Sequence, residues 1–137
     1  MSGSLWDTQT ALYERLTATS DITALLNDGA DSVFDHVPPD ASFPYIVIGP
    51  MSAKPLDTQQ IAACDITAEI NVYTRHHGWR DAKNILSAIY AAVHNASFSV
   101  ANHILILCQH LDTDMTLDVD GETRRGIIRF RLIVEAA

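Results

Sequence analysis

Residues 33–49 read VFDHVPPDASFPYIVIG, and this stretch joins two short apolar runs through a loop that contains three prolines. Each proline fixes its own φ at about −65° and drives the residue before it toward an extended conformation. The loop is therefore expected to be stiff, and the runs at 33–34 and 45–49 are predicted to be short strands. The stretch carries no nucleophile beside a base, no phosphate-binding loop and no metal-ligand spacing. It indicates a role in shape rather than in catalysis.

A longer strand is predicted at residues 62–74, where apolar and polar side chains alternate. The apolar positions are Cys64, Ile66, Ala68, Ile70 and Val72, and the polar positions between them are Asp65, Thr67, Glu69 and Asn71. A period of two indicates a strand with one buried face and one solvated face. The polar segment 52–60, which contains Pro55, is expected to protrude beyond the sheet as a loop.

Helical spacing of apolar residues appears in two places, at residues 5–18 and at residues 79–94. The first helix draws on Leu5, Leu12 and Leu16, with Trp6 and Tyr13 alongside. A short helix between these two is predicted to begin at a Ser20 cap and to end at Gly29. Asn95 tolerates the left-handed conformation, so it is the expected stop of the last helix.

The last third of the chain predicts a hairpin of strands 104–119 and 123–135 around the turn signal Asp120-Gly121. A two-residue loop pairs Asp112 with Arg129, Thr116 with Arg125, His110 with Arg131 and Leu111 with Phe130. This register keeps polar and apolar faces separate, whereas a slip of one residue would mix them. Together these elements predict an α+β fold in one domain over residues 1–137, with a mostly antiparallel sheet and two main helices on one face.

Charge and composition exclude several classes of protein. The chain of 137 residues has a formal net charge of −8, so it would repel nucleic acid on average rather than wrap it. Its two cysteines, Cys64 and Cys108, lie in apolar strand-like runs and are expected to be small buried hydrophobes. The N-terminus lacks a basic segment followed by a long apolar core, and no run of 18 apolar residues occurs, so neither secretion nor membrane insertion is predicted.

Three clusters of polar residues could form a metal site or a nucleic-acid-binding site. The six histidines contain no metal-ligand spacing, and the acidic series from Asp112 to Glu122 lacks the ligand pattern of a calcium loop. Arg124, Arg125, Arg129 and Arg131 could form a nucleic-acid patch, but the register favours an intramolecular or intersubunit salt-bridge face. No catalytic residue, metal ligand or cofactor site is predicted. The alternative left open is a small cytosolic enzyme or ligand-binding domain that uses His36, or His76 and His77.

Taken in order, the chain resembles the tail completion (tail terminator) family of long-tailed phages, which also occurs in prophages and gene transfer agents. The resemblance is carried by Ala11-Leu12 and Leu16 in the first helix, the segments 33–38 and 43–49, the strand 68–73, Ala88-Ile89 with Val93-His94, and the ending DGETRRGI at 120–127. No catalytic residue comes with this family.

The resemblance implies a structural subunit that closes into a ring, expected to be a hexamer. Such a ring docks on the last ring of the tail tube protein, stops its polymerisation and joins the tail to the head connector protein. It would sit at the head-proximal end of the tail in the virion, after assembly in the bacterial host cytoplasm, and DNA would pass through its lumen without specific binding. From the exposure pattern we expect the subunit or partner contacts at Lys54, Asp57, Gln59, Asp112, Arg125, Arg129 and Arg131.

Overall fold

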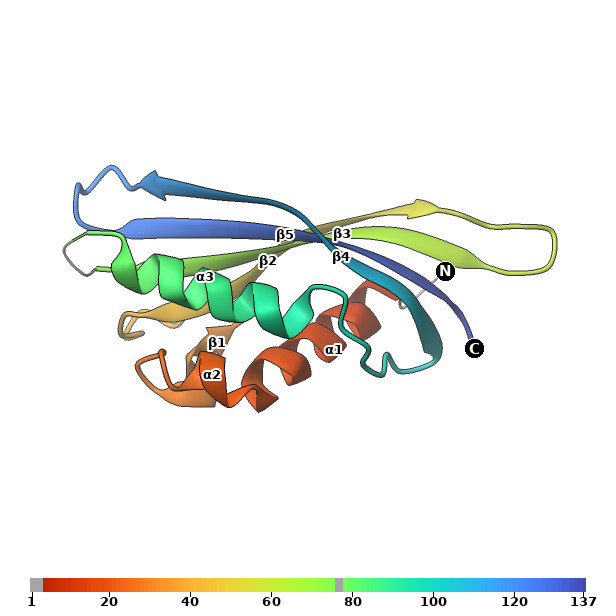
Figure 1. Cartoon of the computed structure of the whole chain (residues 1–137), viewed down its shortest axis with the longest axis horizontal. Coiled ribbons are helices and arrows are strands. Elements are labelled where there is room, and N and C mark those ends of the chain that lie inside the picture. The colour runs from red at the N-terminus through yellow and green to blue at the C-terminus, as the bar shows by residue number, and fades with distance from the viewer. Residues whose placement is uncertain (1–3, 76–77) are drawn as a thin grey trace.

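The computed structural model describes residues 4–75 and 78–137 (Figure 1). Its elements are α1 (Ser4–Ala18), α2 (Ser20–Thr23), a 3-10 turn (Gly29–Ser32), β1 (Val33–Phe34), β2 (Tyr45–Pro55), β3 (Ala63–Thr74), α3 (Arg80–Val93), β4 (His103–Leu117) and β5 (Arg124–Ala136). The strands form one sheet in the order β1-β2-β3-β5-β4. Only the β1–β2 pair is parallel. The helices lie on one side of the sheet (Figure 1), so the predicted α+β architecture is confirmed.

The core lies between the sheet and the two main helices. The predicted alternation in β3 is confirmed, because Cys64, Ile66, Ala68, Ile70 and Val72 are all buried toward the helices. On the neighbouring strand β5, Phe130 and Leu132 are fully buried and extend this apolar surface. From the helix side, α1 contributes Leu12 and Leu16, and α3 contributes Ile85 and Ile89. Arg15 also ties the two helices together, since its Nε donates to the Ala92 carbonyl at 2.8 Å.

The proline loop brings β2 into the sheet beside β1. The Phe43–Pro44 peptide is cis, and the Pro44 carbonyl accepts a hydrogen bond from the Asn27 amide at 3.1 Å. The ring of Tyr45, the first residue of β2, lies 5.0 Å from that of Phe43 and stacks on Tyr73 of β3 at 5.3 Å. This aromatic cluster fixes the start of β2, as expected of a segment that determines subunit shape.

Three local expectations are wrong. The cap of the short helix is Thr19 rather than Ser20, and Gly29, at φ +58°, begins the 3-10 turn instead of ending α2. Half of the segment 52–60 is also strand, because residues from Ser52 to Pro55 pair with β3 and only residues 56–62 form the connecting turn. That turn projects beyond the sheet (Figure 1), so the predicted protrusion exists but is shorter.

The β4–β5 hairpin follows the predicted register only near its turn. Asp112 lies opposite Arg129 and Thr116 opposite Arg125, as predicted. The closing pair is Asp118 with Thr123, and Asp120 accepts hydrogen bonds from both amides that follow Gly121, so the loop is longer than two residues. Farther from the turn the register shifts at Leu111, which is left unpaired. His110 therefore faces Phe130, and the predicted Leu111–Phe130 and His110–Arg131 pairs are wrong.

A second shift leaves Ile106 unpaired between Leu105 and Leu107. Each of these bulges inserts a residue whose side chain the sheet does not bury, and Ile106 and Leu111 are both exposed. No described helix is long and apolar enough to cross a membrane.

Candidate interaction surfaces

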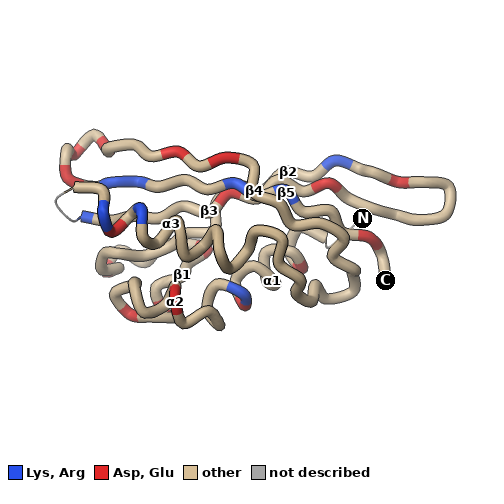
Figure 2. The backbone as a smooth tube through the Cα atoms, in the orientation of Figure 1, with Lys and Arg blue, Asp and Glu red and all other residues tan. Residues whose placement is uncertain are grey.

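The sheet face that the helices leave open carries a row of charged side chains. Figure 2 shows the blue positions of β5 beside the red positions of β4. On this face β5 contributes Arg125, Arg129 and Arg131, because alternate residues of a strand share a face and Ile128, Phe130 and Leu132 point the other way, into the core. The acidic partners come from the two strands on either side, β3 and β4. We call these residues, with Asp65, Glu69, Asn71 and Asp112, the charged face.

Arg131 and Asp65 form its most regular pair. The guanidinium donates through Nε to Oδ1 at 3.0 Å and through Nη2 to Oδ2 at 2.9 Å, a bidentate arrangement that fits the planar carboxylate. These hydrogen bonds lower the pKa of Asp65 and raise that of Arg131. Each group therefore favours the charged state of the other.

Arg129 lies between two carboxylates. Its Nη1 donates to Asp112 at 2.7 Å, and its Nη2 is 3.3 Å from Glu69, and the hydrogen bond to Asp112 raises its pKa. Glu69 also lies 3.6 Å from Arg125, whose Nε donates to Asn71 at 3.0 Å. The predicted pairing of Arg129 with Asp112 is confirmed. All three arginines that sequence analysis proposed for contacts are held by partners within the same chain.

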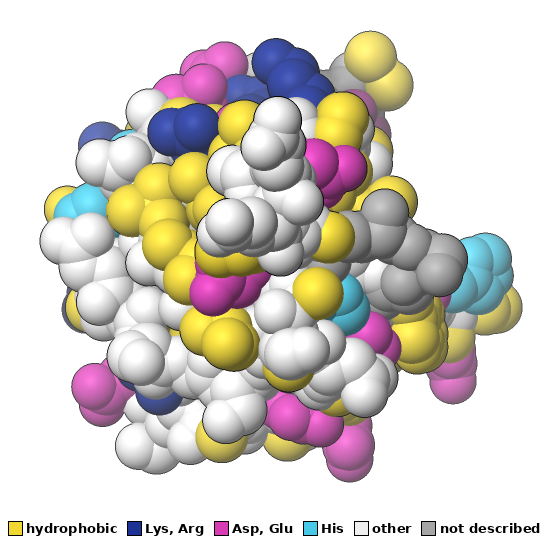
Figure 3. Space-filling view, turned by 90° about the vertical axis from the view of Figure 1, so that its right-hand side faces the viewer, with side chains coloured by type: hydrophobic (Ala, Val, Ile, Leu, Met, Phe, Trp, Pro, Cys, Tyr) yellow, Lys and Arg dark blue, Asp and Glu magenta, His cyan; other side chains and the backbone are white. Residues whose placement is uncertain are grey.

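Lys54, Asp57 and Gln59 lie elsewhere, on and around the projecting β2–β3 turn. Lys54 pairs in register with Asp65, which places it at the border of the charged face. The Oδ1 of Asp57 accepts the Ala63 amide at 3.0 Å and so shapes the turn, and Gln59 is exposed at its tip. Figure 3 views this end of the molecule and shows hydrophobic side chains gathered beside charged ones. The seven proposed contact residues thus form two surfaces, the charged face and the turn.

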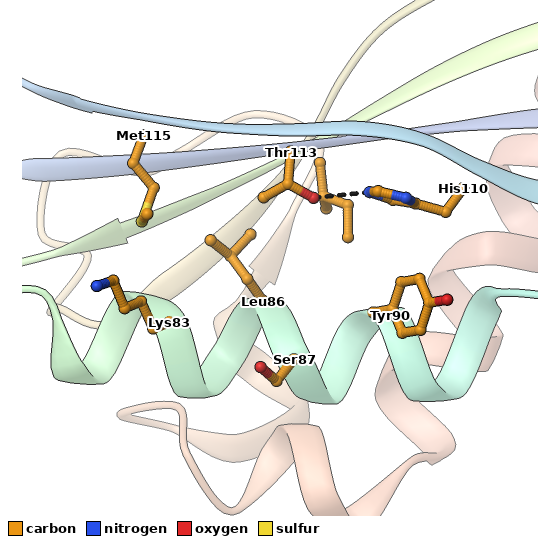
Figure 4. Close-up of a pocket in the computed structure, with 8 residues that line it drawn as sticks. Lys83, Leu86, Ser87, Tyr90, His110, Thr113 and Met115 are labelled. Atoms are coloured by element: carbon orange, nitrogen blue, oxygen red, sulfur yellow. Dashed lines mark hydrogen bonds between the residues drawn. The ribbon is translucent and has the colours of Figure 1, made fainter.

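A groove runs between α3 and β4 on the other side of the sheet (Figure 4). It encloses about 470 Å³ and has an apolar floor of Leu86 and Ile128. Tyr90 of α3 and Met115 of β4 stand at its sides, and the Nε2 of His110 lies 2.7 Å from Thr113 Oγ1. We call it the α3–β4 groove. No sequence signal pointed to it, since it depends on how far the strand stands from the helix.

A second groove of about 300 Å³ lies at the opposite edge of the sheet, between α1 and β2. It is lined by Trp6, Gln9, Thr10 and Tyr13 of α1, with Asp35 and Ile48 opposite. The sequence predicts Trp6 and Tyr13 alongside the apolar side of the helix, yet they are 65% and 41% exposed. Their spacing of seven residues could have revealed this, because it gives α1 a second stripe beside the buried one.

The remaining candidates are the two cysteines and the histidines. Both cysteines are free and buried, as predicted, and burial raises the pKa of Cys108 to about 12. Within residues 4–75 and 78–137, no three His, Cys, Asp or Glu side chains are grouped to hold a metal ion. His36 is exposed on the loop after β1, and His76 and His77 lie outside the described residues. A role for these histidines stays a prediction.

Comparison with solved structures identifies the fold. A chain in the virion of a native gene transfer agent particle matches with a TM-score of 0.89 and 24% identity, over 99% of this chain and 100% of the other. The fold is therefore that of a subunit known from a phage-like particle.

The family follows from the sequence. The family model "Tail completion protein gp17" matches residues 10–135, and the chain belongs to that family. It is 27% identical over 130 residues to tail completion protein gp17 of Bacillus phage SPP1, which covers 92% of this chain and 90% of the relative. The resemblance noted in the sequence is confirmed, and the protein is a structural component of a phage or phage-like particle.

Proposed function

We propose that the protein caps the tail tube as a hexameric ring and joins it to the head connector. The observation that carries this proposal is the family match over residues 10–135, because capping of the tube is what the resemblance to the tail completion family implies. The fold shared with a chain of a gene transfer agent virion supports an assembly role. We propose no reaction and no cofactor for this chain.

The charged face fits a ring through which DNA passes without tight binding. DNA affinity in proteins comes mainly from Lys and Arg side chains that neutralise phosphates. Here Arg129 and Arg131 are already bound by carboxylates, and the chain as a whole carries a net charge of −8. A ring built from such subunits would let the genome slide through its lumen without specific binding.

The contacts with tube and head would then use the two surfaces that project from the fold. We assign the β2–β3 turn, with Lys54, Asp57 and Gln59, and the rim of the charged face, with Asp112, to these partners. Gln59 is the best position for a test, because it is exposed at the tip while Asp57 holds the turn together.

The test uses the purified chain and the tail tube protein of the same particle. Tubes assembled with the chain should be shorter and should carry a six-fold ring at one end in electron micrographs. Gln59→Arg should weaken capping, whereas Asn84→Arg, the same charge change on an exposed position of α3, should not. Tubes of unchanged length with bare ends would refute the proposal.

A further inference from the structure

The two apolar grooves lie at opposite edges of the sheet and differ in character. The α3–β4 groove lies along β4, the last strand in the sheet order, and the α1–β2 groove lies at the other edge. The first is hollowed above a floor of Leu86, and the second carries the exposed indole of Trp6. A ring needs two different patches on each subunit, whereas a two-fold dimer needs one patch that matches itself.

The strands at these edges also have the directions that a head-to-tail contact requires. β2, β3, β5 and β4 alternate in direction across the sheet. At the other edge the two-residue strand β1 lies outside Ile46 and Val47 of β2 and runs in the same direction as β2. When the β4 edge of one copy faces this β1–β2 edge of the next, the facing strands run antiparallel.

Each groove contains one exposed charge, and the two charges are opposite. Lys83 lines the α3–β4 groove and Asp35 lines the α1–β2 groove. Within the described part of the chain neither takes part in an ion pair, in contrast to the arginines of the charged face. Charges of this kind at the rim of a contact select the partner and fix its register.

We propose that the two grooves bind each other between neighbouring copies of this chain. The Trp6 and Tyr13 stripe of one copy enters the α3–β4 groove of the next, against Leu86, Tyr90 and Met115, and Asp35 meets Lys83. The proposal deepens the proposed function, because it names the contact through which the ring would close.

Charge reversal tests the pairing directly, with self-association measured by sedimentation velocity. Lys83→Glu and Asp35→Lys should each weaken association about tenfold or more, because each places like charges together. The double variant Lys83→Glu/Asp35→Lys should regain the wild-type value. A 1:1 mixture of the two single variants should regain it too, since each then offers the other an opposite charge. The control Lys83→Glu/Asp40→Lys has the same net charge as that double variant, but its new lysine lies outside the groove. Its self-association should remain weak.

Trp6→Ser tests the apolar part. Because Trp6 is 65% exposed in the single chain, its loss should reduce association and leave the melting temperature unchanged. If the wild-type chain is monomeric in solution, all variants are scored by the fraction of tube ends that carry a ring.

The outcomes separate the two proposals. If none of these variants changes association or capping, the groove pairing is wrong and the tail-capping role is unaffected. The same holds if Asp40→Lys restores association to the Lys83→Glu variant as well as Asp35→Lys does. A wild-type chain that neither associates nor caps tubes contradicts the tail-capping role itself.

Discussion

α3 approaches the sheet closely where Gly126 of β5 lies under Leu86. A Cβ atom placed on Gly126 would lie 2.8 Å from Leu86 Cδ1 and 3.2 Å from its Cγ. Leu86 is 5% exposed, so it is packed on most sides and can relieve the clash only by shifting toward the α3–β4 groove, whose floor it forms. We predict that Gly126→Ala destabilises the fold, and that the sign of its effect depends on Leu86.

The expected change in the free energy of unfolding is the sum of two opposing effects. Replacing glycine by alanine stabilises by about 0.4–1 kcal/mol through the unfolded chain where the backbone permits it. Overpacking a core costs about 1–3 kcal/mol, which leaves a net loss of about 0.5–2 kcal/mol. Leu86→Ala alone should cost about 2–3 kcal/mol, near the lower end for such truncations, because the groove beside it is already open. In that background the methyl group of Gly126→Ala fills part of the cavity, and the second substitution becomes stabilising.

The assay is urea unfolding of the wild type, both single variants and the double variant, followed by circular dichroism. The expected result is a coupling free energy of about 1–2 kcal/mol between the two sites, with the opposite sign for Gly126→Ala in the two backgrounds. Equal effects of Gly126→Ala with and without Leu86 would refute this account of the contact.

Three further predictions concern the charged face, the hairpin turn and the core thiol. A double-mutant cycle of Asp65→Asn and Arg131→Ala should give a coupling of only about 0.5–1 kcal/mol, because the Arg131 side chain is 38% exposed and solvent screens the pair. Hydrogen bonds from the Thr123 hydroxyl, the Thr123 amide and the Glu122 amide lower the pKa of Asp120 to about 2. The stabilisation from the charge of Asp120 should be complete above about pH 4, where the carboxyl of the unfolded chain is ionised, and should vanish as the pH falls through about 2. A difference in stability between the wild type and Asp120→Asn that stays constant with pH would contradict this. Cys108, buried with a pKa raised to about 12, should react with a thiol reagent only as fast as the protein unfolds, and a rate independent of urea would be the contrary result.

The sequence carries most of the fold because its periodicities are regular. The alternation along β3 identifies both faces of that strand, and the helical spacing in residues 79–94 identifies the buried side of α3. The register of the last hairpin is predictable from Asp112 to the turn, since pairing there depends only on the position of the turn. It fails beyond Leu111 because a bulge depends on how two strands bend around a core, and neither composition nor spacing records that.

The interaction surfaces were predictable in part. Arg125, Arg129 and Arg131 occupy alternate positions of one strand, so their side chains are predicted on the same face. The alternation of apolar and polar residues along β3 likewise places Glu69 on a solvated face. What the sequence lacks is the strand order, which brings β3 beside β5 and so gives Arg129 a second carboxylate besides Asp112. The grooves could not be predicted from the sequence for a similar reason. Each is formed by a helix and a strand whose separation only the folded chain defines.

The way the positive charge is used connects the fold with the proposed role. The chain has nine Lys and Arg residues, and three of its arginines are bound to its own carboxylates across the open face of the sheet. Such pairs add little stability at a surface, so stability alone does not account for keeping three of them in one strand. Their other effect is to hold the positive charge of these three side chains against carboxylates of the same chain. In the proposed ring, such a face would suit a surface along which DNA slides. Lys83 and Asp35, which take part in no ion pair within the described part of the chain, lie at the two edges where the contact between copies is proposed.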